Sequence, residues 1–160
     1  MPYSKQGVSA NFPQALLDAA LALLARREYS RLELRRKLTG RFPDADFDAL
    51  FEYLQRHNYQ SDRRFAQVFV RSWVQRGQGP LRISRELQQR GIAGDLASGA
   101  LAQAEVDWFA FAQEQLQRKY SVHIGAMPPD QRAKEYARRQ RYLAYRGFPA
   151  EVIHWVLGDQ

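Results

Sequence analysis

One helical segment of this sequence is repeated at a constant spacing. The segment Gln75–Ile92 contains a Gly79–Pro80 pair and ends near Gly91. Proline is favoured at the first position of a helix and glycine just after its last turn, so these residues predict where the helix begins and ends. A shift of 49 positions aligns this segment without a gap on an earlier one. The matching pairs are Leu32 with Leu81, Leu34 with Ile83, Arg36 with Arg85, and Leu38 with Leu87.

The other two copies vary the pattern without losing it. In the first copy, Ser30 and Glu33 have the spacing of a capping box, which is a different way to start a helix at the same place. A third copy lies 56 positions after the second, where Arg85, Leu87, Arg90 and Gly91 meet Arg141, Leu143, Arg146 and Gly147. A period of about 50 residues is typical of repeat proteins, whose units stabilise one another.

Apolar residues at helical spacing predict one helix before and one after each copy. The expected helices are 14–28, 30–40 and 44–57, then 62–75, 80–90 and 95–104, and finally 105–120, 130–146 and 149–157. No alternation typical of strands is present. We therefore predict an all-α chain of three tandem three-helix modules in an elongated, curved array. The predicted modules are 14–60, 61–104 and 105–160, after a flexible N-terminal segment 1–13.

The charge of the chain points to a partner and not to a membrane. The 160 residues carry a net charge of +7, and nearly all of the 24 basic residues are arginines, which suit phosphate and carboxylate recognition. A nucleic acid or an acidic protein surface is the expected partner, and a basic face kept for solubility is the alternative. The longest apolar run has seven residues, too few to span a membrane. The absence of cysteine favours the cytoplasm.

Catalytic and metal-binding patterns are absent from the sequence. The three histidines lack metal-ligand spacing, and Gly77-Gln78-Gly79 lacks the third glycine of a dinucleotide site. Asp44, Asp46 and Asp48 resemble the start of a calcium loop, but the required glycine and glutamate are Ala49 and Gln55. We therefore expect no enzyme activity, no cofactor and no metal. The tryptophans Trp73, Trp108 and Trp155 are expected in the core.

Charge is divided between the helices of each module. The second helices are net positive and the third helices net negative. A helix-turn-helix protein places its last helix among phosphates, which an acidic helix opposes. A protein or a protein–nucleic-acid assembly therefore fits better than duplex DNA, although a sequence-specific duplex-binding repressor stays open. The acidic residues could also serve only as helix caps, and the basic residues only as solvated charge.

The candidate residues for binding a protein or nucleic acid are arginines on or beside the second helices. They are Arg26, Arg27, Arg31, Arg35, Arg36, Arg82, Arg85, Arg90, Arg138, Arg139 and Arg141.

Four motifs resemble the RecX family, whose members regulate the RecA recombinase. They are A-R-R-E-Y-S-R-L-E-L-R-R-K-L (Ala25–Leu38), D-R-R-F-A with the following F-V-R (Asp62–Arg71), G-x-G-P-x-R-I-x-x-E-L-x-x-R-G-I (Gly77–Ile92), and R-x-x-x-x-R-G-F (Arg141–Phe148). The resemblance covers about Ala15 to Leu157. One departure is Arg90-Gly91-Ile92, where the family commonly has K-G-I.

This resemblance implies both a fold and a partner. The implied fold is a tandem array of three-helix units, which agrees with the repeat. The implied partner is the RecA filament on single-stranded DNA, with direct contact to that DNA left open. The implied activity is inhibition of ATP hydrolysis, strand exchange and filament growth by a protein that we expect to be a monomer. The family offers no catalytic residues to assign.

Overall fold

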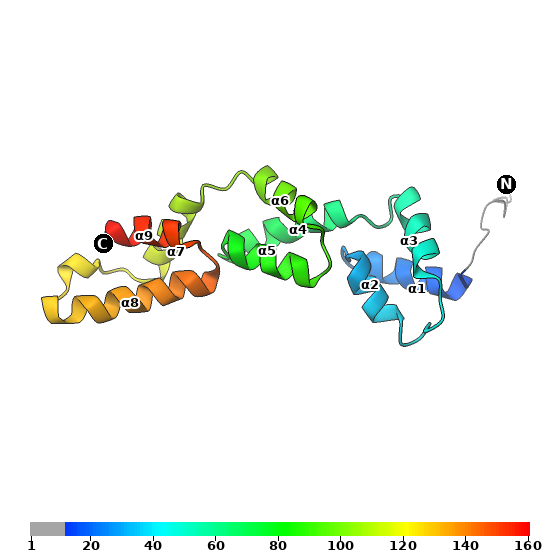
Figure 1. Ribbon diagram of the computed structural model, residues 1–160, viewed down its shortest axis with the longest axis horizontal. Coiled ribbons are helices and arrows are strands. Elements are labelled where there is room, and N and C mark those ends of the chain that lie inside the picture. Colours follow the sequence, from blue (N-terminus) through cyan, green and yellow to red (C-terminus); the bar gives the residue numbers. More distant parts are fainter. Residues whose placement is uncertain (1–11) are drawn as a thin grey trace. The chain divides into compact units, whose positions relative to one another are not determined.

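The computed structural model describes residues 12–160, and the regular elements in that range are helices. Figure 1 shows them in chain order. They are α1 (Gln14–Leu24), α2 (Arg31–Leu38), α3 (Phe47–Arg56), α4 (Asp62–Gln75), α5 (Pro80–Gln89), α6 (Gly94–Gln103), α7 (Trp108–Lys119), the short 3₁₀ helix η1 (Ile124–Ala126), α8 (Pro129–Arg146) and α9 (Ala150–Gly158). The described range contains no strand, and the predicted all-α class is confirmed.

The chain divides into two compact units. The first ends at Phe65 and the second runs from Ala66 to Gln160, so the second unit contains α5 to α9 and most of α4. The module boundaries predicted at residues 60 and 104 stay a prediction. Of the predicted flexible segment 1–13, residues 1–11 lie outside the described residues. Phe12 belongs to the core, where its ring meets Tyr53 edge-on at 6.0 Å between ring centroids.

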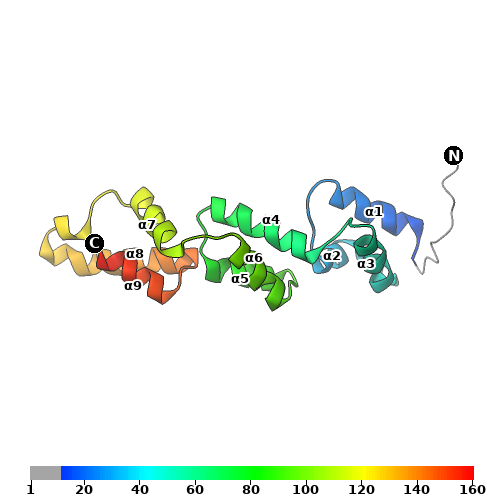
Figure 2. The ribbon, with the colours of Figure 1, turned by 90° about the horizontal axis from the view of Figure 1, so that it is seen from above.

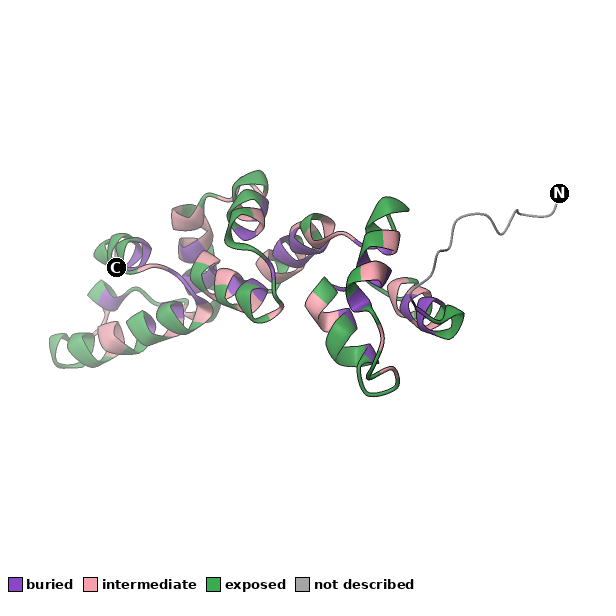
Figure 3. Cartoon of the chain, turned by 45° about the vertical axis from the view of Figure 1, so that its right-hand side comes forward, coloured by how far each residue is buried: buried purple, intermediate pink, exposed green. Residues whose placement is uncertain are grey.

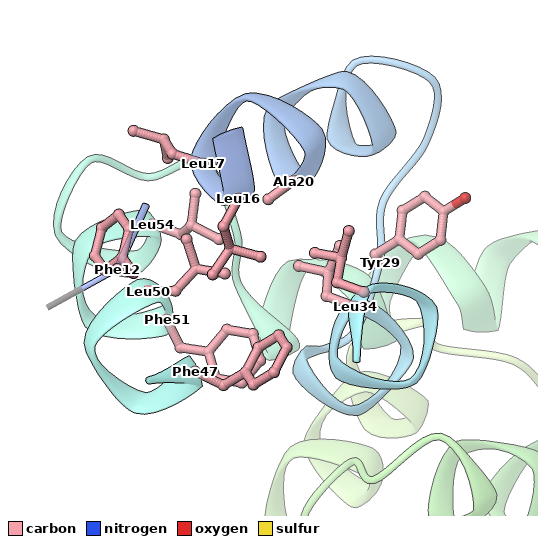
Figure 4. Packing of buried hydrophobic residues seen from close by; sticks show 11 residues of the cluster. Phe12, Leu16, Leu17, Ala20, Tyr29, Leu34, Phe47, Leu50, Phe51 and Leu54 are labelled. Carbon is pink, nitrogen blue, oxygen red and sulfur yellow. The ribbon is translucent and has the colours of Figure 1, made fainter. Parts of the chain in front are cut away.

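The first unit has one apolar core formed by its three helices. Leu16, Leu17 and Ala20 of α1 face Leu34 of α2. The side of α3 that faces them carries Phe47, Leu50, Phe51 and Leu54, spaced three to four residues apart as an amphipathic helix requires. Figure 4 shows these side chains pointing toward one another between the helices, with Tyr29 at one end of the cluster.

All three helices of the first unit are shorter than predicted, and α2 covers Arg31–Leu38 of the expected 30–40. Helix α1 ends at Leu24 and not near Glu28, so Arg26 and Arg27 lie in the turn before α2. Helix α3 begins at Phe47 and not at Asp44, because the side chain of Asp46 accepts the backbone N–H of Ala49 and caps the helix there. Stripes of apolar residues therefore predicted the helices themselves but not their first and last turns.

Polar contacts attach the start of α4 to the first three helices. The guanidinium of Arg64 donates to the Glu28 carboxylate at 2.6 Å and to the backbone oxygens of Asn58 and Tyr59. Asp62 accepts the backbone N–H of Arg31 at 2.9 Å. These contacts hold the first residues of α4 to the rest of the first unit.

The predicted helix starts and stops of the repeat are confirmed. Ser30 and Glu33 form both hydrogen bonds of a capping box at the start of α2. Gly79 is the N-cap of α5, and Pro80 is its first residue. Gly91 and Gly147, with φ of 77° and 97°, follow the ends of α5 and α8 in the left-handed region that favours glycine.

The second unit contains two groups of helices. Buried apolar residues of α4, α5 and α6 include Val70, Ile83, Leu87 and Ala100. A second core is shared by α7, α8 and α9. Helices α8 and α9 lie side by side in both views (Figures 1 and 2) and are in contact. Most of α8 is exposed (Figure 3), and its buried residues are Arg139 and Leu143.

The tryptophans are less buried than predicted. Trp73 and Trp108 are partly buried. Trp155 is 47 % exposed and meets Phe109 edge-on, so its predicted place in the core is wrong. The apolar face of α9 is formed by Val152, Ile153, Val156 and Leu157. Because these four residues lie on the opposite side of the helix from residue 155, the Trp155 ring is left at the surface.

Candidate partner-binding surface

Helix α2 exposes the basic residues of the first unit. Arg31 and Arg35 are exposed on α2, and each guanidinium lies over an aromatic ring of α3: Arg31 over Phe51 at 5.1 Å and Arg35 over Phe47 at 5.4 Å. Such cation–π contacts hold an arginine in place while its charge stays available to solvent. Arg36, the arginine present in all three copies, is exposed on the same helix.

The turn before α2 adds two predicted residues. Arg26 is exposed there. The guanidinium of Arg27 lies 3.6 Å from the ring centre of Tyr29, and it donates to the backbone oxygen of Glu28 and to the Glu33 carboxylate. Arg27 is therefore bound to its own unit, and we expect it to support this surface more than to extend it.

The arginines of α5 have two different environments. Arg85 is exposed. Arg90, the C-cap residue, donates to the Glu86 carboxylate at 2.6 Å and lies over Phe69 at 4.8 Å and over Trp73 at 5.8 Å. Because its guanidinium is already neutralised and stacked, Arg90 has less to offer a partner than Arg85 has.

The adjacent residues Arg138 and Arg139 of α8 have opposite environments. Arg138 and Arg141 are exposed, whereas the Arg139 side chain is 1 % exposed. Its guanidinium donates to the Glu135 carboxylate at 3.0 Å, to Gln160 Oε1 at 2.6 Å and to the Val122 backbone oxygen at 2.7 Å. Because this side chain is buried and bonded within the chain, we expect Arg139 to support the fold and not to contact a partner directly. Charge alone could not distinguish it, because adjacent helix residues face different ways.

Helices α5 and α8 meet through their backbones. The N–H of Gly79 donates to the Arg146 backbone oxygen at 2.7 Å, and the N–H of Leu81 donates to the Gly147 backbone oxygen at 2.9 Å. Helix N-termini have unpaired N–H groups and helix C-termini have unpaired carbonyls, so the end of α8 satisfies the start of α5. The opposite partial charges of the two helix ends, positive at the start of α5 and negative at the end of α8, add to this contact.

This contact brings Arg82 of α5 to Tyr145 of α8. The Arg82 guanidinium lies 4.8 Å from the centre of the Tyr145 ring and 5.7 Å from that of Trp73. Tyr145 was not among the predicted residues, although its spacing from Arg138 and Arg141 places it on the same helix face. That helical spacing could have identified Tyr145 as a candidate residue from the sequence. The comparison of the three copies could not identify Tyr145, because no aromatic residue stands at the equivalent positions of the other two copies.

The described residues show neither a metal site nor a membrane span. Within residues 12–160, no three histidine, aspartate or glutamate side chains gather as metal ligands would. Every helix in the same range is too short or too polar to cross a bilayer.

Family models match two parts of this chain. Residues 61–101 match the model described as "RecX, second three-helix domain", and residues 105–157 match "RecX, third three-helix domain". Together these two segments cover more than half of the chain. One model covers α4, α5 and most of α6, and the other covers α7, α8 and most of α9.

Similar proteins share most of their length with this chain. "Regulatory protein RecX" of Halorhodospira halophila is 43 % identical over 141 residues, which are 88 % of this chain and 84 % of that protein. The protein of the same name from Ectopseudomonas mendocina is 42 % identical over 142 residues, which cover 88 % and 91 % of the two chains.

A solved structure shares the fold. The crystal structure of RecX from Lactobacillus salivarius aligns with a TM-score of 0.70 at 23 % identity, over 91 % of this chain and 94 % of the other. At that identity the likeness concerns the fold, and the sequence relatives carry the family assignment. The chain belongs to the RecX family of regulatory proteins.

Proposed function

We propose that this chain regulates the RecA recombinase by binding along the RecA filament on single-stranded DNA. Bound there, it inhibits ATP hydrolysis, strand exchange and filament growth. Its membership of a family of regulatory proteins supports this proposal. The single structural observation that carries it is the set of exposed arginines on α2, α5 and α8, with Arg36, Arg85 and Arg141 at equivalent positions of the three copies.

The mode of action we propose is binding without chemistry. A RecA filament presents the same protein surface many times beside a polyanion. A chain with three similar basic helices suits such a repeating target, because several weak contacts in one molecule raise the overall affinity. Arginine serves both kinds of contact, since its guanidinium binds carboxylates and phosphates in the same fork geometry. We propose that the protein acts as a monomer in the cytoplasm and needs no cofactor.

Arg139 is left out of this proposal, and the other predicted arginines remain in it. Exposed Arg31, Arg35, Arg36, Arg85, Arg138 and Arg141 are the main candidates for direct contact. Arg27 and Arg90 have closer carboxylate partners, at 3.4 and 2.6 Å, than Arg35 and Arg138 have, at 3.9 and 3.7 Å. Arg27 and Arg90 are therefore assigned to the edges of the surface.

The test is the ATPase activity of RecA on single-stranded DNA with increasing amounts of this protein. Inhibition at a ratio at or below one molecule per RecA subunit is the expected result. Unchanged ATP hydrolysis at equal concentrations, with binding conditions verified by a RecA–DNA control, would contradict the proposal.

A further inference from the structure

The contact between α5 and α8 creates a small exposed patch with an unusual composition. We call it the junction patch and define it by Leu81, Arg82, Arg85, Arg141 and Tyr145. Tyr145 is 73 % exposed and Leu81 is 52 % exposed, the two highest values among the large apolar residues that are exposed. A single exposed apolar residue needs no explanation, but here an aromatic ring lies among arginines.

The Tyr145 ring is held in position while most of it faces solvent. The Arg82 guanidinium, 4.8 Å from the ring centre, supports it from the neighbouring helix. Arg82 is itself partly buried beside Trp73, so the support comes from the body of the second unit. An aromatic side chain positioned in this way loses little conformational freedom when a second flat group stacks on it.

The two exposed arginines of the patch have no neutralising partner in the part of the chain that the structure describes. Arg85 follows Arg82 by three residues along α5, and Arg141 precedes Tyr145 by four residues along α8, so each lies one helical turn from the ring–guanidinium pair. Within residues 12–160, neither guanidinium forms an ion pair with a carboxylate. Both remain available for a negatively charged ligand.

We propose that the junction patch binds single-stranded nucleic acid by stacking an unpaired base on Tyr145. Arg85 and Arg141 then contact phosphates on either side of that base. Single-strand binding sites combine such aromatic platforms with basic side chains, and every base has a flat face to offer. Duplex DNA fits less well because its bases are already stacked. An acidic peptide would neutralise the arginines but would leave the ring without a flat partner.

The patch exists only where two three-helix domains meet. Arg82 and Tyr145 come from the segments matched by the second and third domain models, and the backbone hydrogen bonds between α5 and α8 hold the two helices together. Neither domain alone carries both the ring and its supporting guanidinium. Base stacking therefore depends on the docked arrangement of α5 and α8.

This inference deepens the proposed function and rests on it for its biological setting, but its test does not need RecA. The full chain is titrated with a thymidine oligonucleotide and with an abasic strand of the same length, which has phosphates but no bases. Tyr145→Ala is compared with Tyr145→Phe, which keeps the ring. Tyr59→Ala is the matched control, because Tyr59 is an exposed tyrosine (47 %) of the first unit. Circular dichroism verifies that each variant keeps its helices.

Loss of one base stack is expected to weaken thymidine-strand binding at least about five-fold in Tyr145→Ala. Binding of the abasic strand should hardly change, and Tyr145→Phe and Tyr59→Ala should bind both strands like the parent chain. A base analogue whose fluorescence falls on stacking should be quenched by the parent, by Tyr145→Phe and by Tyr59→Ala, but not by Tyr145→Ala. Equal losses on both strands, no loss on either, or stronger competition by polyglutamate than by the thymidine strand would overturn the inference. Stacking without any effect on the RecA ATPase would contradict the proposed function alone.

Discussion

Gly79 and Gly147 bring two helix ends so close that neither position has room for a side chain. A Cβ atom on Gly79 would lie 2.6 Å from the carbonyl carbon of Gly147, and one on Gly147 would collide with the Cβ atom and backbone of Arg82. Gly79 and Leu81 also donate hydrogen bonds to backbone oxygens at the end of α8. The last turn of α8 therefore packs directly against the first turn of α5. Residues matched by two separate domain models are thereby joined within one compact unit.

Substitution of Gly147 by alanine is expected to destabilise the second unit by about 2 kcal/mol or more. Its φ of 97° is costly for any residue with a Cβ atom, and the collision with Arg82 adds to that cost. All three tryptophans belong to the second unit, so the fluorescence change during urea unfolding reports on this unit. The urea concentration at the midpoint of unfolding should be lower in Gly147→Ala than in the parent chain.

Gly99→Ala provides the matched control for that experiment. Gly99 lies inside α6, and a Cβ atom there meets nothing within 4 Å. The same change should therefore stabilise the unit by about 1 kcal/mol, since alanine is the better helix former. Equal effects of the two substitutions would show that the Gly147 contact does not matter.

Arg139→Met should cost about 3 kcal/mol of unfolding free energy. The substitution removes a buried guanidinium and leaves Glu135, Gln160 and the Val122 carbonyl without their donor. Arg138→Met is the control, because that side chain is exposed and its ion pair with Glu135, at 3.7 Å, is worth little. Urea unfolding of the two variants measures the difference. If the two substitutions lower the unfolding free energy by the same small amount, the hydrogen bonds of Arg139 do not stabilise the fold as we describe.

The repeat predicted most of the helices but not how they pack together. Ser30, Glu33, Gly79 and Pro80 determine helix starts by local hydrogen bonds and backbone preference, so their roles follow from neighbouring residues alone. The contact of Gly147 with Arg82 joins residues far apart in the sequence. In the sequence, a glycine that ends a helix cannot be distinguished from one that also has a second backbone packed against it.

The dependence of packing on distant residues also explains why the sequence did not distinguish the buried candidate arginine from the exposed ones. Arg138, Arg139 and Arg141 have one chemistry but two environments, and the difference depends on which side of α8 faces the core. Helical spacing from Leu143 could have shown that residue 139 lies one turn away on the buried side. The position of Arg82 over Tyr145 could not be inferred in that way, because it depends on the docking of two helices.

Two acidic residues near α3 distinguish the RecA-filament proposal from the duplex-repressor alternative. A duplex-binding repressor with α3 in the groove should bind DNA more tightly when Asp44 and Asp48 become lysine, since two repulsive charges become attractive. Asp46 is left unchanged because it caps α3. We expect no sequence-specific binding to duplex DNA in the parent or in the double variant, as measured by fluorescence anisotropy across a salt series. Tight, sequence-dependent binding that increases in the variant would favour the repressor.

The central claim is that arginines of the second helices hold the protein on a RecA filament. Its most direct test is inhibition of the RecA ATPase on single-stranded DNA by the triple variant Arg36→Gln, Arg85→Gln, Arg141→Gln. The control, Arg56→Gln, Arg71→Gln, Arg118→Gln, removes the same charge from exposed residues of α3, α4 and α7. Loss of three charged contacts of about 0.5–1 kcal/mol each should raise the half-inhibitory concentration about ten-fold or more, with the control near the parent value. Equal inhibition by the two triple variants would contradict the claim.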